Sequence, residues 1–293
     1  MITYARSESI WGEYKGYAKN PVLTNRNKAP YIIQGIGHGD LICDKNGDWH
    51  ILCLGFRQIH MWMPYHTLGR EVFLIPVQFG SDGWFTAGND GTCEESYEMK
   101  GDFVQNEKRS YTLENTAWNI DWCYLRHPHT ENYELSDSKA VLHGTDITLD
   151  DVDSPTFIGI RQRDFNMELT ADISLESGEG GVTVYHCEQE HYEVALRSTE
   201  SGYEAILKLN IGGIKHIQTA VPVSGNKAKL IVRADSQIYN FYVNDGEKEV
   251  HLGCGQAKYL SSEVCGGFTG VVLGMYAVNG TSEFTGFRVD YRD

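Results

Sequence analysis

The chain has 293 residues, a formal net charge of -15, 41% hydrophobic and 12% aromatic residues, and 31 glycines. This length and composition predict a soluble, turn-rich protein of two ordinary domains rather than a disordered chain. Because a negative surface repels phosphate groups, we expect no nucleic acid and no membrane surface as partner, whereas a neutral sugar is compatible.

Seven cysteines occur at positions 43, 53, 93, 123, 187, 254 and 265, an odd number without a CxxC pair. This pattern argues against a disulfide framework and against a zinc ribbon, and it favours a reducing compartment. Residues 1–16 contain neither the basic nor the apolar region of an export signal. No apolar run approaches the roughly 18 residues of a membrane span. We therefore expect a cytoplasmic protein.

Short alternating or apolar runs separated by Gly, Asn and Asp recur along the chain, whereas helical periodicity is hard to find. Residues 2–6 already have the pattern of a strand, without a lead-in segment. Further strands are expected at residues 41–43, 49–56 and 71–77, with an Asn-Gly hairpin turn in residues 45–48. Because these strands lie close together in sequence, we expect them to pair as a meander.

Polar and acidic residues predominate from residue 89 to residue 108, which predicts an inter-domain linker. The sequence thus divides into residues 1–88, this linker, and residues 109–293. In the last region at least nine short strands are expected, and their spacing predicts a sandwich of two sheets. These strands are expected at residues 156–160, 165–175, 181–187, 192–196, 205–210, 229–234, 238–243, 268–277 and 284–291.

The densest polar and aromatic cluster runs from residue 37 to residue 84, and its loop of Trp, Tyr, His and Arg residues suits a sugar ring. His38, between two glycines, could reach a ligand, a water or a metal, or could be a structural hydrogen-bonding residue. Arg70 could recognise a substrate or form an ion pair with Glu71. Asp40 could belong to a catalytic carboxylate pair, but no second carboxylate is marked, which favours a turn or strand-entry role.

Other chemistries find little support, because the sequence holds no GxSxG, P-loop, GxGxxG or HExxH motif. His127 and His129 lack the spacing of metal ligands. Acidic residues within 148–153 could hold calcium through oxygen ligands, although a solvated acidic loop is the favoured interpretation. Four aromatic residues could form a carbohydrate-binding face, although core or sheet packing is favoured for them. They are Trp122, Tyr185, Tyr192 and Tyr239.

The sequence GHGDLICDKNGDWHILCLGFR, followed by YHTLGREVFLIPVQFGSDGW, resembles the last catalytic-domain blade of glycoside hydrolase family 43 β-xylosidases and α-L-arabinofuranosidases. The upstream stretch ITYARSESIWGEYKGYAKNPVLTNR is similar to the segment that follows the general-acid motif of this family. Downstream, TLDDVDSPTFIGIRQRDFNMELTADI and CGGFTGVVLGMYA resemble the β-sandwich that is appended in the xylosidase branch. The resemblance covers nearly the whole chain.

The resemblance implies an all-β protein, a partial five-bladed β-propeller followed by a lectin-like (concanavalin A-like) β-sandwich whose loop closes one side of the propeller pocket. By this resemblance, Arg70 matches the arginine that hydrogen-bonds the glycone hydroxyls. His38 matches the histidine at the propeller centre near a water or calcium, and Phe268 matches the sandwich aromatic that reaches into the active site. No cofactor is expected to be required, and calcium is the candidate metal ion at His38.

The family inverts configuration and uses an Asp base, a second Asp that tunes the acid, and a Glu acid in an EGPH-like motif. None of these motifs is present in the sequence, and all three are expected upstream of Met1. Roughly three of the five blades are expected to be missing with them. We therefore expect a fragment that is inactive by itself and has open sheet edges through which it could self-associate.

Two functions follow as alternatives. In the first, the chain is a fragment or one half of a split β-xylosidase or α-L-arabinofuranosidase, which acts on xylo- or arabino-oligosaccharides only with its N-terminal half. In the second, the chain is a non-catalytic carbohydrate-binding or interaction module whose functional part is the sandwich. The choice between xylose and arabinose depends on pocket walls that the absent blades largely contribute.

Overall fold

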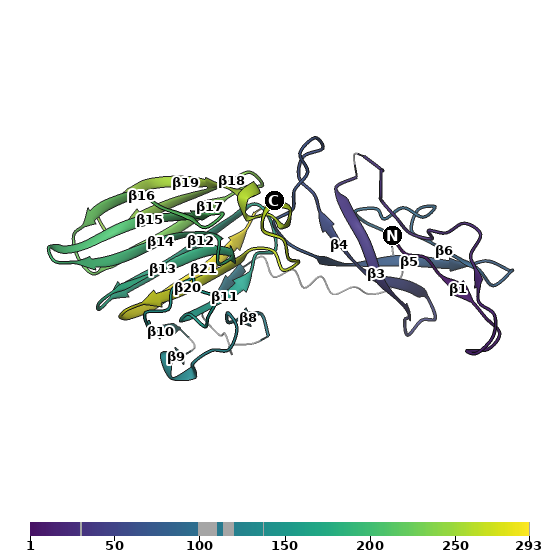
Figure 1. Cartoon of the computed structure of the whole chain (residues 1–293), viewed down its shortest axis with the longest axis horizontal. Helices are drawn as coiled ribbons and strands as arrows, with labels where there is room; N and C mark the ends of the chain where they lie inside the picture. Colours follow the sequence, from purple (N-terminus) through teal and green to yellow (C-terminus); the bar gives the residue numbers. More distant parts are fainter. Residues whose placement is uncertain (30, 99–109, 114–119, 137, 293) are drawn as a thin grey trace. The chain divides into compact units, whose positions relative to one another are not determined.

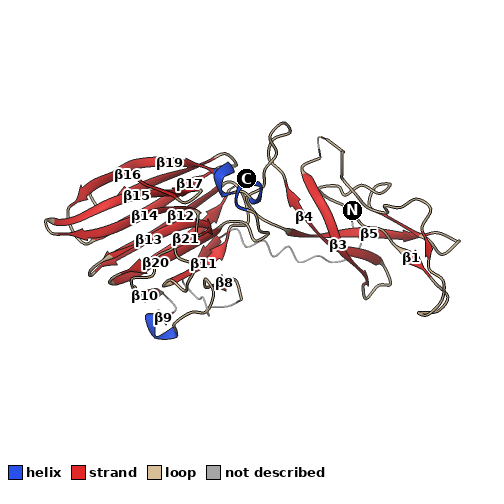
Figure 2. Ribbon diagram, viewed as in Figure 1, coloured by secondary structure: helices blue, strands red, loops and turns tan. Residues whose placement is uncertain are grey.

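The computed structural model describes residues 1–29, 31–98, 110–113, 120–136 and 138–292. The chain divides into two compact units, Met1–Gln105 and Asn106–Asp293, which we call unit 1 and unit 2 (Figure 1). Strands dominate both units, and the helices among the described residues are short (Figure 2). None of these helices is long and apolar enough to cross a membrane.

Unit 1 is built around a four-stranded antiparallel sheet whose strands pair in chain order, which confirms the predicted meander. The strands are β3 (Ile33–Cys43), β4 (Trp49–Arg57), β5 (Glu71–Phe79) and β6 (Phe85–Ala87). A two-stranded ribbon of β1 (Ala5–Arg6) and β2 (Lys15–Gly16) precedes them.

The turn between β3 and β4 is the predicted Asn-Gly hairpin. Gly47 adopts a φ of 87°, which glycine reaches without a steric penalty. The Asp44 carboxylate accepts hydrogen bonds from the backbone N–H groups of Asn46 and Asp48, at 2.8 and 2.9 Å. These bonds hold the turn and pair the ends of the two strands, Cys43 with Trp49.

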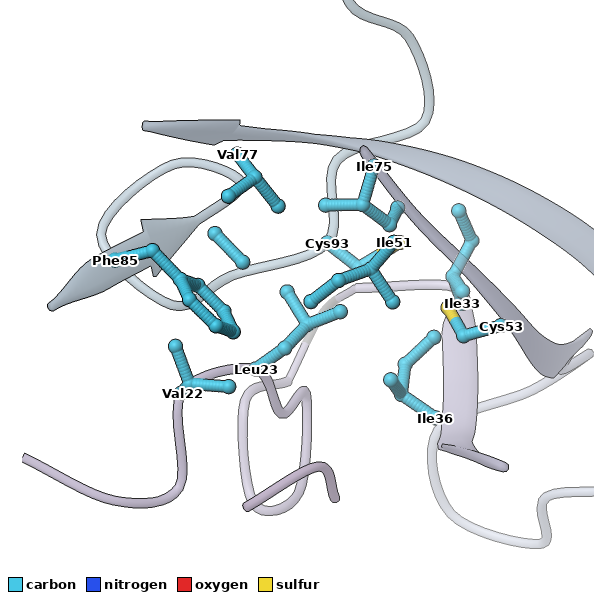
Figure 3. Packing of buried hydrophobic residues seen from close by; sticks show 11 residues of the cluster. Val22, Leu23, Ile33, Ile36, Ile51, Cys53, Ile75, Val77, Phe85 and Cys93 are labelled. Carbon is cyan, nitrogen blue, oxygen red and sulfur yellow. The ribbon is translucent and has the colours of Figure 1, made fainter. Parts of the chain in front are cut away.

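One face of this sheet forms the core of unit 1. Ile51 of β4 pairs with Ile75 of β5, and both side chains are almost fully buried. Figure 3 shows them packed with Leu23, from the segment before the sheet, and with Phe85 of β6. The N-terminal segment thus contributes core residues as well as the ribbon, and burial of this apolar surface stabilises the unit.

The other face of the sheet exposes apolar side chains, because neighbouring residues of a strand point to opposite faces. Leu52 and Leu74 are paired across β4 and β5 and are 40% and 38% exposed. Val72 is 63% exposed and Ile42 is 38% exposed. We call these four side chains the outer face of unit 1.

The described part of the predicted linker packs against unit 1. The Asn25 amide donates a hydrogen bond to the Cys93 carbonyl at 2.8 Å and accepts one from the Cys93 N–H at 2.9 Å. Cys93 is fully buried in the core of the unit. Residues 99–108 of the predicted linker lie outside the described residues.

Unit 2 is a sandwich of two antiparallel sheets, as predicted (Figure 1). The first sheet has the order β19-β18-β17-β12-β21-β10-β9, with β7 paired to β21. Its strands are β7 (Ser110–Thr112), β9 (Tyr133–Ser136), β10 (Lys139–His143), β12 (Met167–Leu175), β17 (Lys227–Ala234), β18 (Ile238–Asn244), β19 (Glu249–Gln256) and β21 (Thr281–Tyr291).

The second sheet has the order β16-β15-β14-β13-β20-β11-β8. Its strands are β8 (Trp122–Cys123), β11 (Phe157–Arg161), β13 (Glu179–Cys187), β14 (Glu190–Thr199), β15 (Gly202–Ile211), β16 (Ile214–Val223) and β20 (Val272–Val278). The two sheets meet in an apolar core, where the Tyr192 ring of β14 packs edge-on against Phe241 of β18. The short helical segments are η1 (Thr130–Asn132), η2 (Ala257–Leu260) and α1 (Ser262–Cys265).

A buried charge network lies on the side of the second sheet that faces away from the first. His191 Nε2 lies 3.3 Å from the Asp150 carboxylate and 3.4 Å from the Glu193 carboxylate. The Lys208 ammonium lies 2.9 Å from Glu193 and 2.6 Å from Glu179. Burial lowers the pKa of His191, but Asp150 and Glu193 more than offset this and raise the pKa to about 9.

The His191 contacts predict that unit 2 loses stability in mild alkali. The folded-state pKa of about 9 exceeds the ordinary 6.5, so the stabilisation is complete below pH 6.5 and is lost as the pH rises through 9. We expect a loss on the order of 2 kcal/mol between pH 6.5 and pH 10. The test is to measure the free energy of unfolding in urea for the wild type and for His191→Gln, at pH 6.5 and at pH 10. Equal pH dependence in the two proteins would contradict the assignment.

Candidate functional site

His38 lies within β3, between two glycines. Its backbone φ is 48°, a left-handed value that is uncommon outside glycine, and the pairing of β3 with β4 shifts register on both sides of Gly37. A Cβ atom at Gly39 would lie 2.5 Å from the Ile2 side chain, so a glycine is needed for β3 to pass over the core. Because the strand is bulged here, the exposed His38 side chain does not follow the regular alternation of side chains between the two faces of the sheet.

Arg70 follows Gly69, whose φ is 71°, and it immediately precedes β5. The adjacent Glu71 binds Arg57 of β4: Arg57 Nε lies 3.0 Å from Oε1, and Nη2 lies 3.0 Å from Oε2. The Glu71 carboxylate, which was considered as a partner of Arg70, forms a bidentate pair with Arg57. Arg70 itself is exposed.

The segment from β4 to Arg70 has a fixed base and an exposed tip. Ile59 and Tyr65 form a bridge, and Trp62 at the tip is 92% exposed. The His66 ring is buried and stacks on Phe56, with the ring centroids 3.9 Å apart and the planes at 10°. This stack supports the segment that carries Arg70, and sequence reasoning did not identify it.

The strand register places His38 and Arg70 in the same half of the sheet. Gly37 pairs with Leu54, which pairs with Val72, so the start of β5 lies near the row of Gly37. With β4 between them, the two residues are separated by about two strand spacings, roughly 10 Å across the sheet.

Asp40 lies in the middle of β3, opposite Leu52, and is exposed. It is neither at a turn nor at the entry to the strand, so that structural interpretation is wrong. The turn carboxylate is Asp44 instead, which accepts the hydrogen bonds of the β3–β4 hairpin.

Phe268 lies in the loop between α1 and β20 of unit 2. The sequence predicted a strand from residue 268, but β20 begins at Val272. The glycines before it, Gly266 and Gly267, each have a φ of 74°, and Gly270 has a φ of 72°, which is incompatible with a strand. The Phe268 side chain is 61% exposed and so is not a core residue.

The aromatic residues that could have formed a carbohydrate-binding face are buried, which confirms the favoured core interpretation. Tyr185 stacks on His191, and Tyr192 packs into the core between the sheets. The most exposed of the four is Trp122, at 8%. Side chains buried in this way offer no face to a sugar.

The acidic segment 148–153 binds other protein groups. The Asp150 carboxylate accepts a hydrogen bond from the Asn210 amide at 2.6 Å and pairs with Lys215 at 2.9 Å. Asp151 accepts hydrogen bonds from the backbone N–H and the hydroxyl of Thr148, both at 2.8 Å. These donors compete with a cation for the same oxygens, so the segment is a poor calcium site.

Comparisons with known proteins decide the family. Residues 111–292 match the family described as beta xylosidase C-terminal concanavalin A-like domain, and residues 1–85 match glycosyl hydrolases family 43. The chain belongs to glycoside hydrolase family 43. It is 32% identical to the non-reducing end alpha-L-arabinofuranosidase BoGH43B of Bacteroides ovatus, over 93% of this chain and 53% of that protein. A xylosidase/arabinosidase of Butyrivibrio fibrisolvens is 24% identical, over 94% of this chain and 55% of that protein.

Solved structures of family 43 proteins have the same fold. The GH43B structure from the Bacteroides ovatus xyloglucan locus aligns with a TM-score of 0.88 and 30% identity, over 98% of this chain and 60% of that one. The GH43 protein BlXynB of Bacillus licheniformis aligns with a TM-score of 0.87 and 25% identity, over 99% of this chain and 60% of that one. The predicted fold class is therefore confirmed. This family 43 chain spans about half the length of the curated relatives it matches.

The position of Phe56 can be tested by substituting alanine for two glycines, both of which have a left-handed backbone conformation. A Cβ atom at Gly35 (φ 65°) would lie 2.1 Å from the Phe56 ring, whereas one at Gly47 (φ 87°) would meet no atom within 4 Å. Gly47→Ala should cost about 1 kcal/mol of unfolding free energy, from backbone strain alone. Gly35→Ala should cost roughly 2–4 kcal/mol, because Phe56 must also leave its stack on His66. Equal losses in urea unfolding of the two variants would show that Phe56 does not occupy this position.

Proposed function

We propose that this chain supplies the sugar-recognition part of a family 43 glycosidase that removes arabinose or xylose from oligosaccharides. The catalytic Asp, Asp and Glu would belong to a part of the catalytic domain outside this sequence. Support comes from the family match of residues 1–85, from relatives named arabinofuranosidase and xylosidase/arabinosidase, and from a span of about half their length.

The observation that carries this proposal is the family match of residues 1–85, a range that includes the exposed Arg70. Arg57 holds the neighbouring carboxylate of Glu71 in a bidentate pair, and the left-handed Gly69 turns the chain just before Arg70. An exposed guanidinium offers a planar fork of donors, which suits two adjacent hydroxyl groups of a sugar ring. The Phe56–His66 stack beside it restricts the segment and so reduces the entropy that is lost on binding.

In the complete enzyme, an inverting mechanism requires two carboxyl groups on opposite faces of the sugar, roughly 6.5–9.5 Å apart. One protonates the leaving oxygen and the other activates the attacking water. Arg70 would hold the terminal sugar so that its anomeric carbon lies between them, which is a positioning role. Phe268 would exclude water from one side of the pocket.

His38 would lie at the centre of the completed propeller. Calcium takes oxygen ligands, and His38 offers an imidazole nitrogen in an exposed position of β3. The residue therefore does not fit direct calcium coordination, and contact through a water molecule is the arrangement we propose. No step of the mechanism is assigned to the ion.

The outer face of unit 1 would be covered by the rest of the catalytic domain. Leu52, Val72 and Leu74 are between 38% and 63% exposed on adjacent strands. The blades of a propeller stack their faces around a common axis, so such a face meets another blade in the complete fold. The alternative is that a second copy of this chain covers the face.

All seven cysteines are free thiols, which supports a reducing, cytoplasmic location.

A chimaera tests the role of Arg70. The N-terminal half of the Bacteroides ovatus relative would be fused to this chain and assayed on aryl α-L-arabinofuranoside and aryl β-D-xyloside. Loss of a charge-assisted hydrogen bond costs roughly 2–3 kcal/mol, so Arg70→Ala should lower kcat/KM about 100-fold. Arg70→Lys should recover only part of this loss, because an ammonium lacks the planar fork.

Arg197→Ala is the control, since Arg197 pairs with Glu204 in unit 2 and has no part in the proposed site. Its kcat/KM should match that of the unmodified chimaera. Unchanged kcat/KM in Arg70→Ala, with activity present in the parent, would refute the assigned role.

A further inference from the structure

Three side chains of unit 2 bring potential metal ligands together. His186 and Cys187 lie at the end of β13, and Cys265 ends the short helix α1. One nitrogen or sulfur atom of each lies within 4.8 Å of the others, and no other group of His, Cys, Asp and Glu in the described residues meets this criterion. The cluster joins positions 78 residues apart (265 minus 187), so no CxxC spacing announces it.

A bulge in β13 allows two consecutive residues to belong to one cluster. In a regular strand, His186 and Cys187 would point to opposite faces of the sheet. The pairing with β14 skips a residue here, because Tyr185 pairs with His191 and Cys187 pairs with Glu190. His186 is therefore the extra residue, and a bulge is the usual device that re-aims a side chain.

The His186 imidazole is buried beside the two thiols. The residue is only 8% exposed, and neither ring nitrogen is in hydrogen-bond geometry with a partner among the described residues. The sulfur atoms of Cys187 and Cys265 approach one of its nitrogens within 4.8 Å. Buried polar groups are normally paired, so an ion held by all three side chains would satisfy the imidazole.

The two thiols of the cluster face oxygen atoms of the protein. The Cys187 sulfur lies 2.8 Å from Oε2 of Glu190, and the Cys265 sulfur lies 3.2 Å from the carbonyl oxygen of Tyr259. Because cysteine binds a metal as the thiolate, metal binding would release the protons of these thiols.

We infer that His186, Cys187 and Cys265 form a binding site for one divalent metal ion of the zinc class. Two sulfur atoms and an imidazole are the donors that zinc selects, whereas calcium and magnesium take oxygen. Ligand atoms around a tetrahedral zinc lie about 3.5–3.8 Å apart, so the cluster must contract by about 1 Å at most. Glu190, whose Oε2 lies 2.8 Å from the Cys187 sulfur, is one candidate for the fourth position, and a water is the alternative.

The metal would tie the loop of Phe268 to the second sheet. Cys265 is followed directly by Gly266 and Gly267, and a Cβ atom at Gly267 would lie 3.9 Å from the His186 ring. The loop is glycine-rich, and a bond to Cys265 would fix its base. The inferred metal site does not depend on the proposed function. Only the effect of the metal on sugar binding would depend on it.

Metal binding by the whole chain, purified without a histidine tag and under reducing conditions, tests the inference. We expect about one equivalent of zinc per chain after dialysis, measured by mass spectrometry of the elements. Cobalt(II) should give the strong thiolate charge-transfer band and the intense visible bands of a tetrahedral site. Cys265→Ser should lose both signals. His186→Gln should bind the metal ion with at least tenfold lower affinity.

Cys43→Ser is the matched control, because Cys43 is an exposed free thiol in unit 1. It should bind zinc as the wild type does, and zinc should raise the melting temperature of both but not that of Cys265→Ser. Should Cys265→Ser fail to fold, the cobalt spectrum of the wild type still decides whether thiolates bind the ion.

Absence of stoichiometric zinc and of the charge-transfer band would overturn the inference. A Cys187–Cys265 disulfide, found by peptide mass analysis of unreduced protein, together with no metal binding after reduction, would overturn it as well. If Cys43→Ser and Cys265→Ser lost zinc binding to the same extent, the ion would bind elsewhere, and this result would contradict the proposed site.

Discussion

A β-sheet has two faces, and unit 1 buries only one of them with its own residues. Ile51 and Ile75 are covered by the N-terminal segment, while Leu52 and Leu74, one position along each strand, remain 40% and 38% exposed. Burial of apolar area contributes about 25 cal/mol per Å², so this face is a source of stabilisation that unit 1 leaves unused. We propose that the rest of the catalytic domain covers this face, as the next blade does in a propeller.

The described part of unit 2 buries an apolar core between its own two sheets. Its two sheets share a core in which Tyr192 and Phe241 are fully buried, and the ion pairs of His191, Glu193 and Lys208 occupy the other side of the second sheet. Those charges occupy part of the outer side of the second sheet. The metal inferred beside them would fix the base of the loop that carries Phe268.

Local sequence rules predicted much of this fold, and their failures have physical causes. The apolar run from Trp49 to Phe56 and the Asn-Gly turn before it predicted the first hairpin, because both signals are local. β3 is longer than predicted because three glycines, at positions 35, 37 and 39, lower the strand propensity of its first half. β16 was missed because it is an edge strand whose residues are mostly exposed and lack a buried alternation.

The candidate site was accessible to sequence reasoning only in part. Motif resemblance singled out Arg70, His38 and Phe268, but no local pattern shows that Arg57 occupies Glu71 or that Phe56 stacks on His66, because these contacts join different strands and loops. The cluster around His186 was invisible for a similar reason: it depends on a one-residue bulge and on a cysteine far along the chain.

The central proposal is that this chain recognises the terminal sugar and that the groups that break the bond lie outside this sequence. The most direct measurement is the hydrolysis of aryl α-L-arabinofuranoside and aryl β-D-xyloside by the purified chain alone. The account predicts no release of the aryl alcohol above the buffer rate, because general acid and base catalysis needs both carboxyl groups. Turnover that follows the chain through purification and disappears in Asp40→Asn would contradict it.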